Sequence, residues 1–318
     1  MSRAFWLALV LAALLACFGH AADITFIAVS DTHFMVPDSK NDGKRKILAT
    51  MNDIAGRKFP ALLKGATIGK PLGVMVAGDL IDGGREAQAQ WNLWTRDFAL
   101  AGGDGAVLRL PVYETWGNHD GGKLVPDAIA GRNKSRVGIT AISTDNNGDG
   151  TSYSWDWGQL HMMSVGMYPG NTIESNKHRS PGYAPRRSLD FLLSDLSKQV
   201  GDRKRPGVVM QHLNLPNDSD EWWTSDQRNA YYDVLKKYNV VAIVDGHEGG
   251  GLWKWKGIDV LGCNDINSGY WIVQVAGNRM MAARTTNGDS WKKAVLDKTI
   301  ELGKPIDKFA PAAKKTPR

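Results

Sequence analysis

The chain has 318 residues and a formal net charge of +6 at pH 7, and 42% of its residues are hydrophobic. Beyond the first residues no apolar run approaches the roughly 20 residues of a membrane-spanning helix, so we predict no transmembrane segment. The sequence contains no internal repeat or low-complexity block. The modest positive charge favours a small anionic substrate, but it does not predict a specific nucleic-acid partner.

Residues 1–22 have the pattern of an export signal peptide. Arg3 supplies the positive start, residues 4–16 are apolar but too short to span a bilayer, and small residues follow for a signal peptidase. We therefore expect an exported protein, periplasmic or secreted. A lipid anchor on Cys17 is the less favoured alternative, because Leu15 is bulky for a lipid-attachment motif.

Removal of this signal leaves 318 − 22 = 296 residues, enough chain for a large core without disulfides. Cys263 is then the remaining cysteine, and we expect it to be a small buried apolar residue rather than a nucleophile. The last segment, 291–318, is rich in lysine and proline. It predicts a basic, partly disordered extension.

The first half of the chain alternates strand and helix patterns. We expect strands near 24–29, 72–77 and 111–116, with helices near 45–56 and 84–99 between them. Such alternation favours right-handed crossovers and a largely parallel sheet.

The second half is more mixed. Residues 121–150 indicate a surface excursion, and 151–157 with 160–165 predict a hairpin around Gly158-Gln159. Helices are expected at 187–199 and 225–237, with strands before His212 and Gly246. A second, more antiparallel sheet is expected from the short strands near 252–256, 258–262, 270–275 and 279–285.

Five apolar runs of strand character end in polar residues of metal-ligand type. Since open α/β sheets place their sites at the carboxyl ends of parallel strands, these clusters predict one common site. They are Asp31-Thr32-His33, Gly78-Asp79, Gly117-Asn118-His119-Asp120, Gln211-His212 and Asp245-Gly246-His247-Glu248.

Mixed nitrogen and oxygen donors suit borderline divalent metals such as Mn, Fe, Zn or Co. Asp31 and His33 lie two apart on an extended segment and can turn to one side, while the two oxygens of Asp79 can bridge a pair of ions. Two ions about 3.5–4 Å apart can activate a hydroxide and neutralise a phosphoryl group.

These clusters and their order resemble the calcineurin-like metallophosphoesterase superfamily, whose pattern is D-x-H, G-D, G-N-H-[DE], H and G-H-x-H. The resemblance covers roughly residues 24–250 and has four of the five blocks intact. It implies a four-layer αββα sandwich of two packed mixed β-sheets flanked by helices, in one domain over 23–290. It also implies hydrolysis of phosphoric esters, by a phosphatase or a phosphodiesterase, through a metal-bound hydroxide.

The resemblance also implies roles for single residues. Asp31 and His33 would hold the first metal, Asp79 would bridge, and the second metal would be completed by Asn118, His212 and His247. His119 would face the substrate and protonate the leaving oxygen. Asp120 would orient the imidazole of His119.

Gly249 departs from the family pattern, which has a ligand of the first metal at that position. Glu248 does not replace it, because its side chain on an extended segment points the other way. We therefore expect two divalent ions with a weak first site. A non-catalytic phosphate-binding module of the same fold is the alternative.

Other features keep plainer interpretations. His161, His178 and Asp82 are expected to be structural, the last as a helix cap. The loop 145–156 imitates a calcium site, but a turn rich in asparagine and glycine explains it better.

Trp222 and Trp223 could form a rim over the site or pack under a loop. The excursions also carry basic residues that could bind the rest of an anionic substrate, namely Arg132, Lys134, Arg136, Lys177, Arg179, Arg186 and Arg187.

Overall fold

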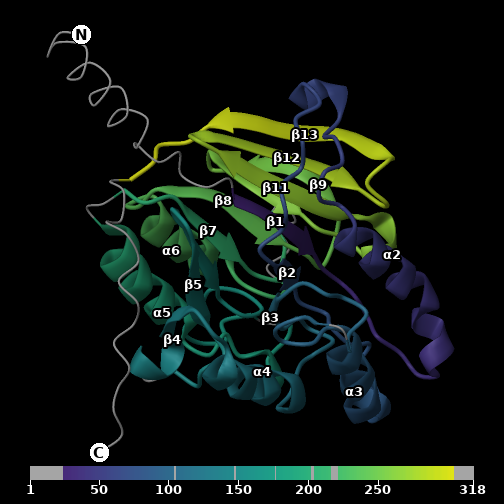
Figure 1. Ribbon diagram of the computed structural model, residues 1–318. Helices are drawn as coiled ribbons and strands as arrows, with labels where there is room; N and C mark the ends of the chain where they lie inside the picture. Colours follow the sequence, from purple (N-terminus) through teal and green to yellow (C-terminus); the bar gives the residue numbers. More distant parts are fainter. Residues whose placement is uncertain are drawn as a thin grey trace, which may run out of the picture.

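The computed structural model describes residues 24–303 except 104, 147, 176, 202–203 and 216–220. Two β-sheets pack face to face, and helices cover the outer side of each (Figure 1). The expected four-layer αββα sandwich is confirmed. The predicted export signal and most of the predicted C-terminal extension lie outside the described residues.

The first sheet has six strands in the order β13-β12-β11-β1-β2-β3. Strands β1, β2 and β3 run parallel, while β11, β12 and β13 add to them in antiparallel fashion. The strands are β1 (Ile24–Val29), β2 (Val74–Ala77), β3 (Val112–Thr115), β11 (Tyr270–Ala276), β12 (Arg279–Thr285) and β13 (Trp291–Thr299). Strands β1 and β2 are buried along their whole length, as expected of parallel strands covered on both faces.

The second sheet has seven strands in the order β4-β5-β6-β7-β8-β10-β9. Its central strands β6, β7, β8 and β10 are parallel to their neighbours in this group. The strands are β4 (Ile139–Ile142), β5 (Tyr153–Trp157), β6 (Leu160–Ser164), β7 (Gly207–Met210), β8 (Val240–Asp245), β9 (Gly251–Trp255) and β10 (Ile258–Gly262).

Helices α2 and α3 flank the first sheet, and α5 and α6 flank the second (Figure 1). The hydroxyls of Thr50 in α2 and Tyr270 in β11 lie 3.0 Å apart, and Ser154 in β5 donates to Asp195 in α5. The α-helices are α2 (Asp42–Asn52), α3 (Ala87–Asp97), α4 (Leu124–Ser135), α5 (Ser188–Asp195), which continues as one π-helical turn (Leu196–Val200), and α6 (Ser225–Leu235). Short 3₁₀ helices span Asp38–Asn41, Ala61–Leu63, Gly84–Glu86, Ser143–Asn146, Pro181–Tyr183 and Ile266–Ser268.

Aromatic rings fill the space between the two sheets. The ring of Phe26 in β1 lies 5.3 Å from that of Trp157 in β5, and Tyr113 in β3 stacks on Trp155 at 4.4 Å. Burying such large apolar surfaces stabilises the sandwich by about 25 cal/mol per Å² removed from water.

The sequence suggested a separate sheet for the strands after residue 250, but these strands divide between the two sheets. Strands β9 and β10 extend the second sheet, whereas β11 and β12 extend the first next to β1. Alternation of apolar and polar residues predicts a strand, but it does not determine which sheet edge the strand joins.

The start of the predicted C-terminal extension and part of the predicted surface excursion form regular elements. Residues 291–299 form the edge strand β13, and Lys298 there contacts Asp259 of β10. Lysine-rich edge strands are common because charge on an open edge prevents pairing with other chains. The excursion 121–150 contains helix α4, where Val125 and Ile129 are buried one turn apart.

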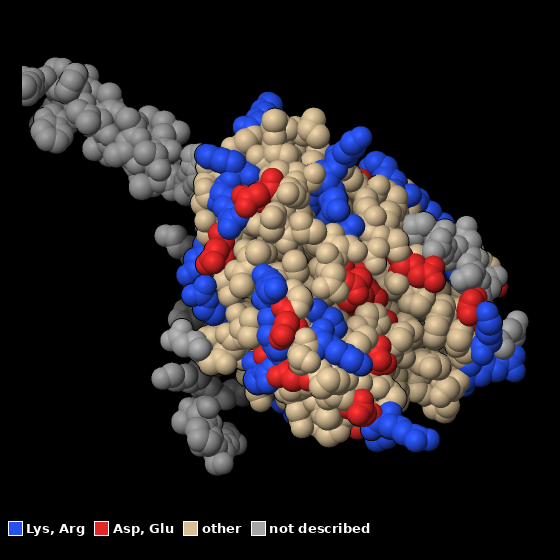
Figure 2. All heavy atoms as spheres, turned by 90° about the vertical axis from the view of Figure 1, so that its right-hand side faces the viewer, with Lys and Arg blue, Asp and Glu red and all other residues tan. Residues whose placement is uncertain are grey.

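No helix of the described residues is long and apolar enough to cross a membrane. On the face that Figure 2 shows, acidic and basic side chains are interspersed rather than gathered by sign. That face therefore offers no continuous basic surface.

Candidate metal centre

The two sheets meet at the carboxyl ends of five strands. Three of these strands, β1, β2 and β3, lie side by side in the first sheet, and β7 and β8 lie side by side in the second. Each of the five predicted clusters follows one of these strands. Neighbouring parallel strands end at the same edge of a sheet, so the polar side chains converge from both sheets.

Four of the predicted ligands have left-handed backbone conformations. The φ angles are 51° for Asp31, 38° for His33, 50° for Asp79 and 70° for His247. Residues other than glycine rarely adopt this region, and such strain gathers at functional sites where the surrounding fold enforces it. Here the turns after β1, β2 and β8 direct the side chains inward.

Two glycines let the sheets approach at this edge. A Cβ atom on Gly78 would lie 2.5 Å from the Nδ1 atom of His212, and one on Gly246 would lie 1.9 Å from the Oγ of Ser30. Any side chain there would clash, so glycine is required beside the ligands.

Three atoms that can bind a metal converge on one side of the site. The amide oxygen Oδ1 of Asn118 lies 2.9 Å from the Nε2 of His212 and 2.9 Å from the Nδ1 of His247. Neighbouring ligand atoms that sit about 2.1 Å from one ion at right angles are roughly 3 Å apart. The Nδ1 of His212 donates to the carbonyl oxygen of Ala77 at 2.8 Å, which leaves its Nε2 free to bind a metal.

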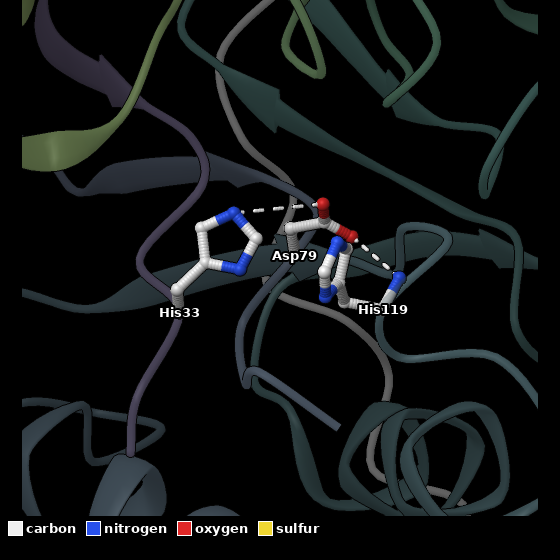
Figure 3. A group of neighbouring side chains, drawn as sticks. All are labelled: His33, Asp79 and His119. Carbon is white, nitrogen blue, oxygen red and sulfur yellow. Dashed lines mark hydrogen bonds and ion pairs between the residues drawn. The ribbon is translucent and has the colours of Figure 1, made fainter. Parts of the chain in front are cut away.

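Asp79 lies between this group and a second one. Ligand atoms of Asp79, His212 and His247 lie within 4.8 Å of one another, and so do those of His33, Asp79 and His119. Figure 3 shows His33 and His119 beside the Asp79 carboxylate, and their rings meet edge-on with centroids 4.7 Å apart. One carboxylate shared by two groups of imidazoles has the arrangement of a bridging ligand.

The second group is looser. The Nε2 of His33 lies 3.7 Å from an oxygen of Asp31 and 3.7 Å from an oxygen of Asp79. The other carboxylate oxygen of Asp31 accepts the backbone N–H of His247 at 3.1 Å. The Nδ1 of His33 is buried without a hydrogen-bond partner in the described residues.

The electrostatics of the site favour a cation. Burial alone would raise the pKa of Asp79, but the imidazoles of His212, His119 and His33 hold it at about 2. Burial also opposes charge on His212, yet Asp79 raises its pKa to about 9. A site that draws a proton onto a buried imidazole in this way fits a divalent metal ion, which would take the proton's place.

The surroundings of His119 differ from the expected ones. Its Nδ1 lies 3.0 Å from the backbone carbonyl oxygen of Asp82. Asp120 does not contact that ring, because its fully buried carboxylate accepts the backbone N–H groups of Leu80, Ile81 and Gly117. Burial and the nearby Asp79 raise the pKa of Asp120 to about 7. Asp120 therefore joins the turns after β2 and β3 and does not orient His119.

Asp82 is structural, but it does not cap a helix. The N-cap residues of the 3₁₀ turn Gly84–Glu86 and of α3 have no side-chain cap. The backbone carbonyl of Asp82 holds His119 instead. Sequence analysis missed this role because any residue supplies a carbonyl.

Lys44 is a second residue that the sequence analysis missed. It is 5% exposed, its ammonium group donates to the carbonyl oxygen of His33, and burial lowers its pKa to about 8. The signal was its position, because Lys44, Leu48 and Met51 share the buried face of α2. Lys44 thus supports the left-handed turn that carries His33.

Gly249 lies beyond His247 in open space. A Cβ atom there would have no heavy atom within 4 Å, and its φ angle is 68°. The position therefore has room for a side chain, which the backbone conformation would strain.

The two tryptophans have separate roles. Trp222 stacks on His178 at 3.6 Å and meets the ring of His247 edge-on at 5.6 Å, so it borders the site. Trp223 is 2% exposed and packs between Tyr168 and Tyr231. One tryptophan thus forms a rim while the other packs in the core.

Two other plain interpretations agree with the contacts. His161 is buried between Asp156 and Asp195, away from the site. Cys263 is 1% exposed, and burial raises the pKa of its thiol, which makes it a poor nucleophile.

Two carboxylates in the calcium-like loop, those of Asp149 and Asp156, are bound to protein groups. Asp149 accepts from Thr151 and Arg186, and Asp156 lies in β5 against His161 and Arg205. A turn explains this segment.

Most of the basic residues in the excursions contact carboxylates. Arg132 and Arg136 share the buried carboxylate of Glu114. The other pairs are Lys177 with Glu221, Arg186 with Asp149 and Arg187 with Asp190. The positive charge of these residues is therefore largely paired with carboxylates of the protein itself.

Comparison with known proteins adds a family match. A family model described as calcineurin-like phosphoesterase matches residues 24–250, which is more than half of the chain. No curated protein matches the sequence.

Solved structures of similar fold share little sequence with this chain. GAP50, described as the anchor in the inner membrane complex of Plasmodium, has 10% identity and a TM-score of 0.53, over 90% of this chain and 91% of its own. TT1561 of Thermus thermophilus has 13% identity and a TM-score of 0.43, over 82% and 98%. Vacuolar protein sorting 29 from Cryptosporidium parvum has 10% identity and a TM-score of 0.36, over 87% and 98%. At these identities the likeness concerns the fold alone.

Proposed function

Because this chain belongs to the calcineurin-like phosphoesterase family, we propose that it hydrolyses phosphoric esters at a centre for two divalent metal ions. Asn118, His212 and His247 would hold one ion and Asp79 would bridge. Asp31 and His33 would hold the other, more weakly, since Gly249 provides no imidazole. Mn, Fe, Zn and Co suit this mixture of donors.

Divalent ions at these ligands would supply the Lewis acidity that activates water and neutralises charge on phosphoryl oxygens. His119 completes the chemistry on the protein's side. Its Nδ1 must carry a proton, because the carbonyl oxygen of Asp82 can only accept. When the ring takes up a second proton at Nε2, that atom can deliver it to the leaving oxygen.

One observation carries this proposal: the convergence of the amide oxygen of Asn118 with the imidazole nitrogens of His212 and His247, each 2.9 Å away. Two ring nitrogens and an amide oxygen this close together in a largely buried site can serve as ligands of one cation. The bridging position of Asp79 supports a second ion beside the first.

The test starts from protein stripped of metal and reloaded with Mn, Fe, Zn or Co in turn. Bound metal is counted after dialysis, and hydrolysis of a chromogenic phosphate monoester is compared with that of the matching diester. We expect turnover with at least one metal, and one ion held more tightly than the other. Asp79→Asn should lose both metal and turnover, whereas Asp190→Asn on the surface of α5 should lose neither.

A non-catalytic phosphate-binding module is the second candidate, and the glycine at 249 is the observation that favours it. Absence of hydrolysis with every metal, together with binding of inorganic phosphate, would support this candidate. The orientation of His119 argues for catalysis, since a binder has no need of a proton donor.

We also propose export of the protein through the signal in residues 1–22. N-terminal sequencing of the protein secreted or released from the periplasm tests this. Cleavage near Ala21 or Ala22 supports it, and an intact N-terminus or a lipid on Cys17 contradicts it.

A further inference from the structure

A hollow of about 430 Å³ opens beside the proposed proton donor. Asn118, His119, Ser180 and Tyr183 are among the residues that line it. Its volume lies within the roughly 300–1,000 Å³ of small-molecule sites, so it can hold much more than a methyl group. The group that leaves in the proposed hydrolysis would lie next to His119, which lines this hollow.

The walls of the hollow are built by close backbone contacts. A Cβ atom on Gly121 would lie 2.8 Å from the ring of Tyr183, and one on Gly182 would lie 2.7 Å from the backbone nitrogen of Gly122. The segment with Tyr183 therefore lies directly against the segment that follows His119. Substitution at either glycine would separate them.

Tyr183 is held in position by other rings. It meets Trp222 edge-on at 5.3 Å and His178 edge-on at 5.9 Å. Its hydroxyl has no hydrogen-bond partner among the described residues. A fixed aromatic ring with an unused hydroxyl in the wall of a hollow is suited to contact a ligand.

The hollow is lined mainly by neutral groups. Within the described chain, its lining contains no Lys, Arg, Asp or Glu. Arg186, which donates to the carbonyl oxygen of Gly122, is paired with Asp149 at 2.5 Å. Lys123 is paired with Asp127 at 3.1 Å. A second anionic group in the hollow would lose water without gaining a matching cation.

We infer that the substrate's leaving group is an uncharged alcohol with an aromatic or other ring face, and that Tyr183 selects it by ring contact. This inference rests on the proposed phosphoester hydrolysis. It deepens that proposal by stating which half of the substrate carries no further charge. Tyr183 is a specificity residue here and takes no part in proton transfer.

Three substrates test the inference on the full, metal-loaded protein: benzyl phosphate, 4-carboxybenzyl phosphate and ethyl phosphate, or their methyl diesters if diesters are hydrolysed. We expect kcat/KM to be about tenfold higher for the benzyl than for the carboxybenzyl ester. Tyr183→Ala should raise KM for the benzyl ester about threefold to tenfold and leave the ethyl ester nearly unchanged. Tyr183→Phe should keep the wild-type KM.

Equal use of the benzyl and carboxybenzyl esters, or an equal loss for all esters in Tyr183→Ala, would overturn the inference. A preference for the carboxybenzyl ester that disappears in Arg85→Ala would overturn it too. The exposed guanidinium of Arg85 follows Gly84 of the lining and could then bind the carboxylate. The matched control is Tyr232→Ala, a tyrosine that packs on Trp255 away from the hollow.

A binding measurement separates this inference from the proposed reaction. Benzylphosphonate and 4-carboxybenzylphosphonate cannot be hydrolysed, and their affinities are compared by calorimetry. Tighter binding of benzylphosphonate, which lacks the carboxylate, supports the pocket even if no ester is turned over, provided that Tyr183→Ala weakens this binding. Turnover without any preference leaves the reaction standing and rejects the pocket.

Discussion

The Nδ1 atom of His119 lies 3.0 Å from the backbone carbonyl oxygen of Asp82, and this contact fixes the tautomer of the imidazole. A side-chain carboxylate had been expected in this position. A carbonyl oxygen holds the ring through its Nδ1–H without adding a negative charge. With Nδ1 held in this way, Nε2 is the ring atom left for proton transfer.

Replacement of His119 by Ala should keep both metals and lower kcat by about 10²–10⁴. The physical reason is loss of proton donation to the leaving oxygen. The fall should be largest for ethyl phosphate and small for a nitrophenyl ester, whose leaving group needs no proton. Loss of one metal in this variant would instead make His119 a ligand, which its closeness to His33 and Asp79 would then explain.

Replacement of Asp120 by Ala should destabilise the fold. Its carboxylate accepts the N–H groups of Leu80, Ile81 and Gly117, and all three would be left buried without partners. At about 1–3 kcal/mol for each unsatisfied group, we expect a loss of about 3 kcal/mol or more in the free energy of unfolding. Asp120→Asn, which keeps one acceptor oxygen, should lose less.

Denaturant unfolding of the metal-free variants measures this loss. Exposed Asp190→Ala serves as the control. Unchanged stability of Asp120→Ala combined with a collapse of kcat would restore the direct role toward His119 that the sequence had suggested.

Replacement of Gly249 by His should strengthen the weaker metal site. The position has open space around it, so the imidazole has room to turn toward Asp31 and His33. The imidazole would add one ligand to the ion at this site. We therefore expect the second equivalent of metal to bind with at least about tenfold higher affinity. Part of this gain is offset by strain, because the φ angle of 68° disfavours any side chain.

Gly277→His is the matched control for that strain, since Gly277 also has a positive φ angle, 55°, and open space around it. Metal titration by calorimetry compares the two variants. Equal affinities in Gly249→His, Gly277→His and wild type would show that the missing histidine does not limit the first site.

The sequence could place the candidate ligands at one site because their signal is local. Each cluster follows an apolar strand, and the parallel order of β1, β2 and β3 then brings Asp31, Asp79 and Asn118 to one edge. What the sequence did not reveal depends on distant partners. The carbonyl of Asp82 meets His119 across 37 residues, and the edge strand β13 depends on β12 for its pairing.

His161 should make stability depend on pH. Burial opposes its charge, but hydrogen bonds to Asp156 and Asp195 outweigh burial and raise its pKa above 6.5. Arg205 also contacts Asp156, and Ser154 contacts Asp195, so both carboxylates have a further partner besides His161. A raised pKa in the folded state adds stability that is fully present below pH 6.5 and is lost as the pH rises through the folded value.

The measurement is the difference in unfolding free energy between wild type and His161→Gln from pH 5.5 to 9. The advantage of wild type should shrink as the pH rises. Because the difference removes the contribution of other titrating groups, a constant gap over this range would contradict the raised pKa.

Replacement of Arg284 by Met should stabilise the protein. The Arg284 side chain lies in β12 between the sheets, 7% exposed, and its guanidinium packs against Gly250. The Nε and Nη2 atoms have no hydrogen-bond partner among the described residues, and burial lowers the pKa of the group. Removing an unpaired buried charge while keeping the apolar stem should raise the free energy of unfolding by about 1–3 kcal/mol.

Arg279→Met is the control from the same strand, because Arg279 is paired with Asp297 through two bonds of 2.7 Å and should give no gain. Thermal and denaturant unfolding compare both variants with wild type. A clear loss of stability in Arg284→Met would mean that its guanidinium is satisfied in solution by a bound water or anion. Repeating the measurement in sulfate and in chloride separates these two, since only an anion site would make wild-type stability respond to the choice of salt beyond the response of the variant.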